Sequence, residues 1–540
     1  NADIIDNGVV KNDTGYILRV GGLMLLVTLG GAICAVGTAF FASRAAVGFG
    51  RIIRAKLFTH VEQFSLHEFD TVGTASLITR TTNDTNQVQQ VLVIMLTMLV
   101  TAPMTLIGGI ILAARQDAAL ALVLIGAVPV LVISILVIMA KAIPLFRAMQ
   151  MKLDKLNLVL DEGLTGVRVI RAFDRTAHEQ QRFDVANLDV TDTAITVNRI
   201  VAALWPVMML VLNVSTVAIV WFGSIRINNG DLQVGALSAF MIYALLILFS
   251  LLMLSFLFVM LPRATASAAR INAVLDMRTE ITDTAQPQRP GDLRGHVDFE
   301  DVTFSYPGAE EPAISHVSFS AQPGQVTAII GGTGAGKSTL VNLIPRFYDV
   351  DSGRVLVDGM DVREMTQQDL RAKIGLVPQT AVIFSGTVAE NIRFGNEGAS
   401  DEEVRHAADV AQATEFISEM GDGFNSTISQ GGTNISGGQK QRLSIARALV
   451  RKPEIYIFDD SFSALDYATD AKLRAALRRE TTSATVLIVA QRVSTIIGAD
   501  QILVLDEGRI VGSGSHQELM QSNDVYREIV LSQVTAEEIA

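Results

Sequence analysis

Five long stretches in the first half of the chain contain no charged residue, and they constrain the fold more than any other feature. Each is longer than the roughly 20 apolar residues that a helix needs to cross about 30 Å of hydrocarbon. Buried helices of soluble proteins seldom run so far without a charge. The uncharged stretches are 20–43, 85–114, 118–140, 200–225 and 232–262. They predict five membrane spans at about residues 17–43, 88–114, 118–140, 200–225 and 232–262.

Composition agrees with a chain that has two chemically different halves. Only 18% of the 540 residues are charged, whereas soluble domains usually have about 25%. The net charge is −12, which divides into about +2 for residues 1–280 and about −14 for residues 281–540. An acidic second half argues against a nucleic-acid partner, because binding to a phosphate backbone needs clustered Lys and Arg. The single cysteine, Cys34, excludes a disulfide framework and a multi-cysteine metal site.

The connections between the predicted spans alternate in length. Residues 115–117 and 226–231 form short turns, whereas residues 44–84 and 141–199 form long connections that are rich in Lys and Arg. The positive-inside tendency places the long connections in the cytoplasm. Their apolar residues recur at helical spacing, so we expect the membrane helices to continue into the cytoplasm.

The odd number of spans predicts a further helix. If the second half is cytoplasmic, five spans leave the start of the chain outside. The chain opens with Asn1 and shows neither an initiator Met nor a signal peptide. We therefore expect that the natural gene encodes a sixth span ahead of these five.

A change of composition divides the chain into domains. Pro, Gly, Asp and Arg cluster over residues 276–295 and predict a linker between a transmembrane domain (1–275) and a second domain (296–540). In the second domain, short β-rich runs alternate with helical patterns, which is typical of an α/β fold with a largely parallel sheet. The runs are VTAII, RVLV, EIYIF, ATVLIVA and QILVL.

The first of these strands leads into a glycine-rich loop and then a helix. Glycines let successive backbone N–H groups curl around an anion; Lys337 adds a charge at the outer phosphates, and Ser338 can ligate Mg²⁺. The pattern predicts a nucleotide phosphate site. Its residues are Gly331, Gly332, Thr333, Gly334, Ala335, Gly336, Lys337, Ser338 and Thr339.

Two further segments add to this chemistry. The strand EIYIFDD ends in Asp459, and a carboxylate at this place in a P-loop protein holds the Mg²⁺ shell. The segment Ser436, Gly437, Gly438, Gln439 precedes a helix and presents a hydroxyl and bare N–H groups, which make a second anion-binding device. One chain can hardly direct both devices at the same phosphate.

At this point the sequence resembles the nucleotide-binding domain of the ABC transporter superfamily, and the spans ahead of it resemble an exporter-type (type IV) half-transporter. The resemblance implies an α-helical transmembrane domain followed by an α/β P-loop domain that uses ATP and Mg²⁺. It implies that Tyr306 in FSYPG stacks on adenine and that Gln379 in LVPQT joins Ser338 and Asp459 at the metal. It also makes Ser463 to Asp466 the D-loop and Ser436 to Gln439 the signature.

The same resemblance implies a dimer. In this family, each ATP lies between the P-loop of one chain and the signature of the other. The turns near His67 to Gly73 and Leu164 to Phe173 resemble the coupling helices that dock on nucleotide-binding domains.

The sequence departs from the family pattern at two chemical positions. Asp460 stands where such ATPases usually have the Glu that polarises water, and Gln491 stands where they usually have a histidine. Aspartate is one methylene shorter, and about 1 Å of misplacement can cost roughly a hundredfold in rate. Glutamine cannot carry a positive charge. Both departures predict a site that binds ATP and hydrolyses it slowly. Gln430, where exporters often have Glu, is a weaker departure.

These inferences predict a degenerate-site subunit of a heterodimeric ABC exporter in the plasma membrane, in contact with membrane lipids. Its partner would be a non-identical half-transporter that carries the catalytic Glu and the switch His. Ser436 and Gly438 would complete the partner's active site. The uncharged spans favour a small amphipathic substrate, such as a drug or a lipid. Alternatives are an importer on the exporter fold, a non-transporting ATP-binding sensor or regulator, and a self-sufficient homodimer.

Overall fold

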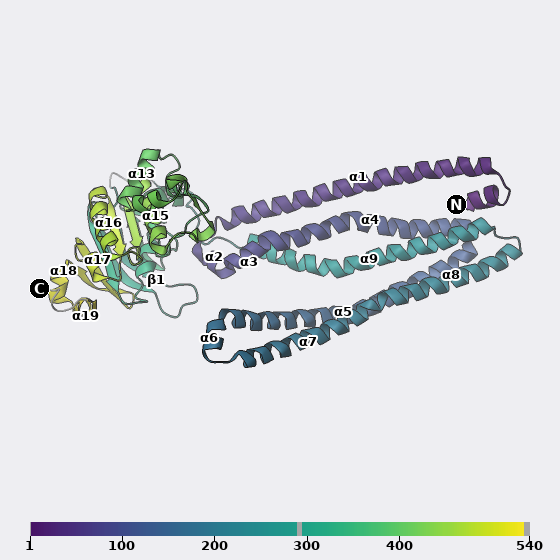
Figure 1. Ribbon diagram of the computed structural model, residues 1–540, viewed down its shortest axis with the longest axis horizontal. Coiled ribbons are helices and arrows are strands. Elements are labelled where there is room, and N and C mark those ends of the chain that lie inside the picture. The colour runs from purple at the N-terminus through teal and green to yellow at the C-terminus, as the bar shows by residue number, and fades with distance from the viewer. Residues whose placement is uncertain (1, 289–293, 534–540) are drawn as a thin grey trace. The chain divides into compact units, whose positions relative to one another are not determined.

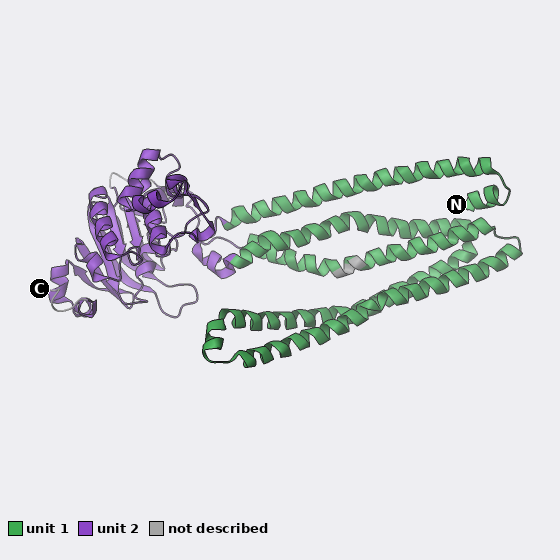
Figure 2. Cartoon of the chain, viewed as in Figure 1, with its two compact units in different colours: residues 1–61, 75–276 green, residues 62–74, 277–540 purple. Residues whose placement is uncertain are grey.

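The computed structural model describes residues 2–288 and 294–533. Residues 289–293 of the predicted linker and residues 534–540 of the predicted second domain lie outside the described residues. The chain forms two compact units (Figure 2). The first contains residues 1–61 and 75–276, and the second contains residues 62–74 and 277–540.

The first unit is a set of long helices (Figure 1). Within the described residues, five helical segments are long and apolar enough to cross a membrane, which confirms the predicted number of spans. Two segments combine consecutive helices and run over Thr74–Gln116 and Thr176–Asn228. The helices of this unit are η1 (Ile4–Val9), α1 (Thr14–Val61), α3 (Thr74–Thr79), η2 (Arg80–Asp84), α4 (Thr85–Gln116), α5 (Ala118–Thr165), α6 (Val167–Ala172), α7 (Thr176–Ala202), α8 (Leu204–Asn228) and α9 (Val234–Leu275).

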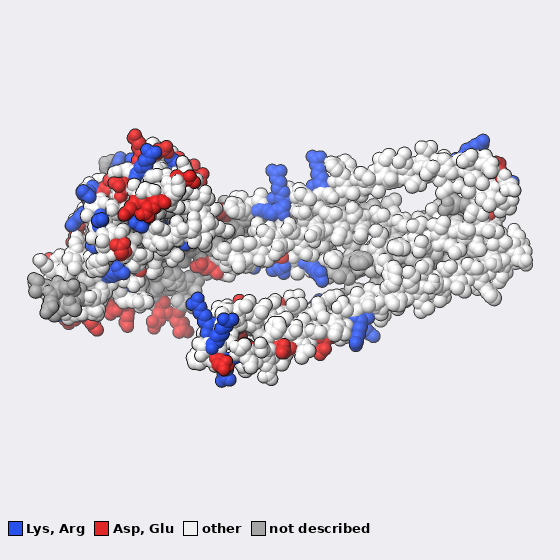
Figure 3. Space-filling view, in the orientation of Figure 1, with Lys and Arg blue, Asp and Glu red and all other residues white. Residues whose placement is uncertain are grey.

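Some hydroxyl groups inside the apolar segments are satisfied within their own helices. The hydroxyls of Thr97 and Thr101 each donate to a carbonyl four residues earlier. Pro103 lies inside α4 and Pro129 inside α5, as membrane helices tolerate. On the face seen in Figure 3, charged side chains are sparse over these helices and dense over the second unit.

Small residues let the helices of the first unit approach closely. A Cβ at Gly109 of α4 would meet Ile247 of α9 at 2.9 Å, so this glycine is needed for the contact. Phe240 and Ile247 of α9 are fully buried together with Ile219 of α8 and Leu120 of α5. These four side chains belong to one apolar core near the turns that join the helices.

Ion pairs fasten helices of this unit to each other, and two of them involve buried carboxylates. Asp117 accepts from the backbone N–H of Leu120 at 2.8 Å, which caps α5, and from Nε of Arg226 at 2.7 Å. Asp84 is buried and accepts from the Ser267 hydroxyl at 2.9 Å and from Nε of Arg270 at 2.8 Å. The second pair joins η2 to α9.

The long connections contain helical extensions, as their spacing predicts. α1 continues without a break to Val61, and α5 continues to Thr165. The short helix α2 (Leu66–Val72) lies in the predicted turn His67 to Gly73, and α6 lies in the turn Leu164 to Phe173. Although α2 is flanked by helices of the first unit, it packs within the second.

Glu68 fixes α2 to the segment that follows α9. Its side chain is buried, with 3% of the residue exposed, and it accepts from the backbone N–H of Ser65 at 2.6 Å and of Glu280 at 3.0 Å. Burial acts to raise the pKa of Glu68, but the hydrogen bonds from Ser65 and Glu280 outweigh it and lower the pKa. This carboxylate is therefore held in its charged form.

The second unit contains three sheets. A four-stranded antiparallel sheet has the order β2-β1-β4-β5, a six-stranded sheet has the order β12-β11-β3-β10-β9-β6, and β7 pairs with β8. The strands are β1 (Val297–Phe304), β2 (Ile314–Ala321), β3 (Val326–Gly331), β4 (Ser352–Val357), β5 (Met360–Asp361), β6 (Ile374–Val377), β7 (Gly386–Thr387), β8 (Thr427–Ile428), β9 (Ile455–Asp459), β10 (Thr485–Val489), β11 (Gln501–Asp506) and β12 (Arg509–Gly514). The run RVLV is a strand, β4, but it lies in the antiparallel sheet.

Helices cover the large sheet. Neighbouring residues of each strand face opposite sides, so Ile330 and Phe458 enter one core, whereas Ile329 and Ile457 enter the other. The remaining helices are α10 (Lys337–Leu343), α11 (Gln367–Ala372), α12 (Val388–Arg393), α13 (Asp401–Val410), α14 (Thr414–Glu419), η3 (Gly423–Asn425), η4 (Gln430–Gly432), α15 (Gly437–Val450), α16 (Tyr467–Glu480), α17 (Val493–Ile496), α18 (His516–Ser522) and α19 (Asp524–Gln533). Burial on both faces explains why these strands read as continuous apolar runs.

The described part of the predicted linker is packed on the second unit. Ile281 is buried, the Asp283 carboxylate accepts from the backbone N–H of Gln367 at 2.9 Å, and the N–H of Gln288 donates to the Glu364 carbonyl at 3.0 Å. The segment therefore acts as an ordered edge of this unit.

Candidate nucleotide site

Three adjacent parallel strands end at the site. In the register of the sheet, Ile329 of β3 pairs with Val489 of β10, and Val489 pairs with Asp459 of β9. The residues that follow these strands therefore meet at one edge of the sheet. Ligands of open α/β sheets bind at this carboxyl edge.

The glycine-rich loop follows β3 and turns directly into α10. Gly334 and Gly336 have φ angles of 85° and 95°, which side chains of L-residues rarely adopt. A Cβ at Gly336 would also meet the carbonyl oxygen of Ala313 at 2.6 Å. The loop therefore needs glycine at position 334 for its backbone conformation, and at position 336 for both its conformation and the lack of space for a side chain. Its backbone is open to a ligand.

Backbone carbonyls of the glycine-rich loop hold the side chain of Lys337 over the loop. Its Nζ donates to the carbonyls of Gly331 at 2.9 Å and Gly332 at 2.6 Å. Burial lowers the pKa of Lys337, while the carboxylates of Asp460 and Asp459 act against this. A partly buried ammonium group beside a ring of backbone N–H groups suits the outer phosphates of a nucleotide.

Ser338 and Asp459 form the second part of the site. The Ser338 hydroxyl donates to Oδ1 of Asp459 at 2.9 Å. Asp459 is 7% exposed, and burial raises its pKa although the Ser338 hydrogen bond opposes this. A hydroxyl and a carboxylate at this distance, with Gln379 lining the same cavity, are oxygen donors of the kind that Mg²⁺ prefers. The residues present therefore fit a magnesium–nucleotide complex.

Two glutamine side chains donate to the carboxylate of Asp460. Oδ2 of Asp460 accepts from Nε2 of Gln491 at 2.8 Å and from Nε2 of Gln379 at 3.3 Å. Asp460 is 8% exposed and has a φ of 45°. Burial raises its pKa, whereas the hydrogen bond from Gln379 lowers it. One oxygen of this carboxylate is thus already engaged by two amides.

Tyr306 also lines the cavity. Its hydroxyl is 2.9 Å from Oγ1 of Thr339 in α10. Its ring is 37% exposed and packs against Phe304 and Tyr348. The cavity has a volume of about 380 Å³. Its lining residues are Tyr306, Ala313, Thr333, Gly334, Gly336, Lys337, Ser338, Thr339, Gln379, Asp459, Asp460, Val489 and Gln491.

Comparison with known proteins agrees with this geometry. Residues 1–252 match the family described as ABC transporter transmembrane region, and residues 314–463 match the family described as ABC transporter. An uncharacterized ABC transporter ATP-binding protein of Mycobacterium tuberculosis is 45% identical over 537 residues, which cover 99% of this chain and 92% of the relative. The chain belongs to the ABC transporter family. Its second unit is therefore an ATP-binding domain of an ATPase family.

Other relatives of this ABC transporter extend the comparison. A fatty acid ABC transporter ATP-binding/permease protein of Mycobacterium bovis is 34% identical over 478 residues, covering 88% of this chain and 75% of the relative. The solved structure of a bacterial Atm1-family ABC exporter with ATP bound has a TM-score of 0.78 and 29% identity, covering 91% of this chain and 87% of that chain. The fold is thus that of an exporter-type ABC transporter, a multi-pass membrane protein with a cytoplasmic nucleotide-binding domain, consistent with the plasma membrane.

Some residues that the sequence places at the site of this transporter do not line the cavity. Gly331 and Gly332 contribute carbonyls to Lys337, and Ala335 is buried beneath the loop. Asp466 caps α16 by accepting from the backbone N–H of Thr469 at 2.9 Å. None of these four residues is among the described residues that line the cavity.

The signature segment also lies outside the cavity. Ser436 caps α15: its hydroxyl accepts from the N–H of Gln439 at 3.3 Å, while Oε1 of Gln439 accepts from the N–H of Ser436 at 2.8 Å. Gly437 and Gly438 form the first turn of this helix, and Ser436 is exposed. The predicted second anion-binding segment is therefore separate from the P-loop cavity.

Sequence patterns missed three contributors to the site. Ala313 and Val489 line the cavity with backbone and apolar surface, which no motif marks. Tyr348 contacts Tyr306 although 42 positions separate them, and only the strand arrangement brings them together. The aromatic run Phe347, Tyr348 after α10 is the one local signal that could have indicated it.

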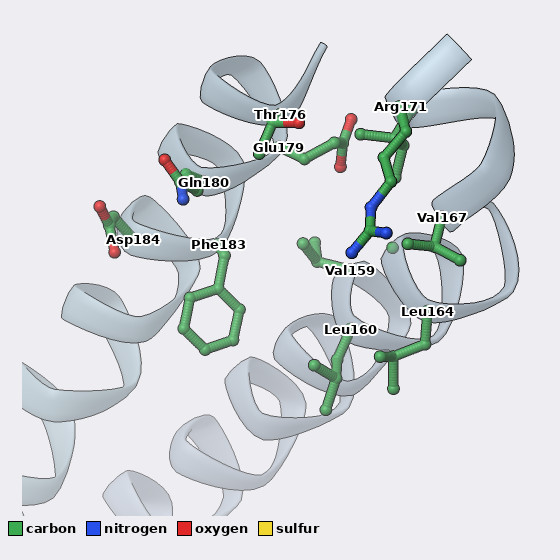
Figure 4. Close-up of a pocket in the computed structure, with 12 residues that line it drawn as sticks. Val159, Leu160, Leu164, Val167, Arg171, Thr176, Glu179, Gln180, Phe183 and Asp184 are labelled. Carbon is green, nitrogen blue, oxygen red and sulfur yellow. The ribbon is translucent and has the colours of Figure 1, made fainter. Parts of the chain in front are cut away.

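A larger cavity of about 540 Å³ lies in the membrane unit, at the tip of the hairpin of α5, α6 and α7 (Figure 4). Apolar side chains such as Val159, Leu160 and Phe183 line it, and Arg171 and Glu179 lie at its polar side. Its described lining residues include no glycine-rich loop.

Proposed function

We propose that this chain is one subunit of a heterodimeric, ATP-driven ABC exporter, and that its own P-loop site binds MgATP and hydrolyses it slowly. One observation carries the proposal. Asp460, at the position of the water-polarising Glu, accepts directly from Gln491, at the position of the switch His. The side chains at the two positions that depart from the family pattern are therefore hydrogen-bonded to each other.

The chemical consequence follows from geometry and charge. A general base must reach the attacking water with a free oxygen and at the correct distance. Asp460 has a shorter side chain than Glu, and its Oδ2 is engaged by Gln491 and Gln379. Gln491 donates a hydrogen bond but cannot supply a positive charge to a developing phosphate charge. Both effects slow hydrolysis and leave binding intact.

The binding groups of the site remain complete. Lys337 and the N–H groups of the glycine-rich loop would bind and orient the phosphates, Ser338, Gln379 and Asp459 would hold Mg²⁺, and the exposed face of Tyr306 would support the adenine. Bound magnesium would neutralise phosphate charge and fix the geometry of the phosphoanhydride. The residues of this chain would then hold ATP in a closed and oriented form.

The partner that we propose is a second, non-identical half-transporter. Ser436 and Gly438 lie away from the chain's own P-loop cavity, and Ser436 is exposed at the start of α15. A hydroxyl and free N–H groups at a helix start bind anions well. These residues would complete the partner's active site, which would supply the Glu and the His that this chain lacks.

For the transported substrate we propose a small amphipathic or lipophilic compound, such as a lipid, a fatty acid or a drug. The five stretches that predict the membrane spans contain no Asp, Glu, Lys or Arg, so they offer little to an ionic substrate. The relative from Mycobacterium bovis is named a fatty acid transporter, which supports the lipid class.

The proposal is tested by copurifying the chain with its candidate partner in lipid and measuring ATP turnover and substrate flux. We expect turnover to be lost when the partner's catalytic Glu is changed to Gln and to persist after Asp460→Asn. Equal losses from both changes, or full turnover by this chain alone, would contradict the heterodimer. Inward flux in sealed vesicles would support an importer, and absence of flux would support a sensor or regulator.

A further inference from the structure

Three aromatic rings meet at Tyr306, which lines the nucleotide cavity. The ring centroids of Phe304 and Tyr306 are 5.0 Å apart with an interplanar angle of 79°, and those of Tyr306 and Tyr348 are 5.4 Å apart at 85°. Phe304 and Tyr348 are 5.3 Å apart. The three rings thus form a closed triangle, which we call the aromatic triad.

The members of the aromatic triad come from different parts of the domain. Phe304 ends β1, Tyr306 follows it, and Tyr348 lies in the loop between α10 and β4. Phe304 is buried in the core, and Tyr348 packs against the same core. The triad therefore connects the exposed Tyr306 to fixed parts of the fold.

A hydrogen bond ties the triad to the phosphate loop. The Tyr306 hydroxyl is 2.9 Å from Oγ1 of Thr339, which stands next to Ser338 in the first turn of α10. Edge-to-face contacts fix the plane of a ring, and a hydrogen bond at its tip fixes its direction. Tyr306 is thus held in a defined orientation before a base stacks on it, and such preorganisation improves affinity.

We propose that Tyr348 is a positioning residue of the nucleotide site, which orients Tyr306 for stacking on a purine base and so favours nucleotides over base-free polyphosphates. The proposal rests on ATP binding at this site, as proposed above. Tyr348 acts through Tyr306 and does not line the cavity in the described structure. Its surroundings agree with a fixed role: burial raises the pKa of Tyr348 to about 12, with Tyr306 and Asp70 adding to the effect.

The test compares two ligands on the full chain in lipid nanodiscs. ATP has a base and inorganic tripolyphosphate has none, so only ATP should depend on the orientation of Tyr306. We expect Tyr348→Leu to weaken ATP binding by about three- to tenfold, with the inhibition constant of tripolyphosphate unchanged. Tyr348→Phe keeps the ring and should bind ATP as the unaltered chain does.

A matched control removes a similar contact elsewhere in the domain. Phe299 and Phe319 stack at 4.6 Å in the antiparallel sheet, away from the cavity lining. Phe319→Leu should leave both ligands unaffected. Equal weakening of ATP and tripolyphosphate by Tyr348→Leu would show a merely structural role and overturn the proposal, as would an unchanged ATP affinity.

A double-mutant cycle keeps the test decisive if one variant folds poorly. Tyr306→Leu removes the ring that Tyr348 is proposed to orient, so Tyr348→Leu and Tyr348→Met should have no further effect on ATP binding in that background. Independent, additive losses would contradict the proposal. If the unaltered chain binds tripolyphosphate and ATP with equal affinity, this inference fails; if it binds neither, the proposed function fails.

Discussion

Gln491 donates a hydrogen bond of 2.8 Å to the carboxylate of Asp460, so the two chemical positions that we propose to differ from the family pattern are in direct contact. A single change at either position would leave the other side chain with an altered hydrogen-bond partner. We therefore expect the effects of changing these two residues to depend on each other.

Changing both Asp460 and Gln491 to the residues of the family pattern should restore ATP hydrolysis at this site. We expect Asp460→Glu together with Gln491→His to raise ATP turnover at this site by about tenfold or more, because the base regains its reach and the switch regains a titratable group. Turnover is measured with the partner's catalytic Glu changed to Gln, which silences the other site. The same pair of changes in a Lys337→Ala background serves as the control, and a rise there would assign the turnover to another site.

The Ser338–Asp459 pair should govern magnesium dependence. Ser338→Ala removes a donor to a buried carboxylate, and a hydrogen bond to a charged group corresponds to about a tenfold change or more in affinity. We expect ATP affinity to fall in the presence of Mg²⁺ and to change little in EDTA. Ser338→Thr keeps the hydroxyl and should retain the dependence. A loss of similar size in EDTA would remove the metal from the explanation.

Glu68 should hold α2 on the second unit in a pH-dependent way. Hydrogen bonds lower the pKa of Glu68 below its ordinary value of 4.5, so its stabilising effect is present above that value and is lost as the pH falls through the lowered pKa. Glu68→Gln should increase amide hydrogen exchange at residues 65–72 by about tenfold at neutral pH. It should also abolish the acid-induced increase. The exposed Glu62→Gln is the control, and its behaving like Glu68→Gln would exclude a specific role for Glu68.

The Asp84–Arg270 pair should fasten η2 to α9. The Asp84 carboxylate is buried and the Arg270 side chain is half exposed, so removing Arg270 leaves a buried carboxylate without its cation and costs about 1–2 kcal/mol. Arg270→Ala should therefore lower the temperature at which the detergent-solubilised protein aggregates. Asp84→Asn with Arg270→Gln removes both charges and should recover part of the loss. If the double variant is less stable than either single variant, the pairing does not explain the stability.

The local parts of the fold could be predicted from the sequence. Uncharged stretches mark membrane helices because charge in hydrocarbon is costly, and the phosphate loop is a continuous segment whose glycines and lysine act together. Asp459 could be placed because a strand of apolar residues ends at it. In each case the information lies within about twenty consecutive residues.

The remaining features depend on contacts between distant segments. The assignment of β4 to the antiparallel sheet follows from its pairing with β1, which no local pattern encodes. The Asp460–Gln491 hydrogen bond depends on the register of β9 and β10. The packing of the linker against Gln367 and the placement of Tyr348 beside Tyr306 likewise require the assembled domain.

The chain passes between its two compact units three times, because α2 belongs to the second unit while α1 and α3 belong to the first. Cleavage at a single protease site engineered between residues 281 and 288 would cut the chain after the third of these passages. The fragment that ends at the cut would still carry α2, and the other would carry most of the second compact unit, to which α2 also belongs. We therefore expect the two fragments to copurify after limited proteolysis. The nucleotide-binding domain would then be held to the rest of the chain by the packing of α2 as well as by the covalent linker.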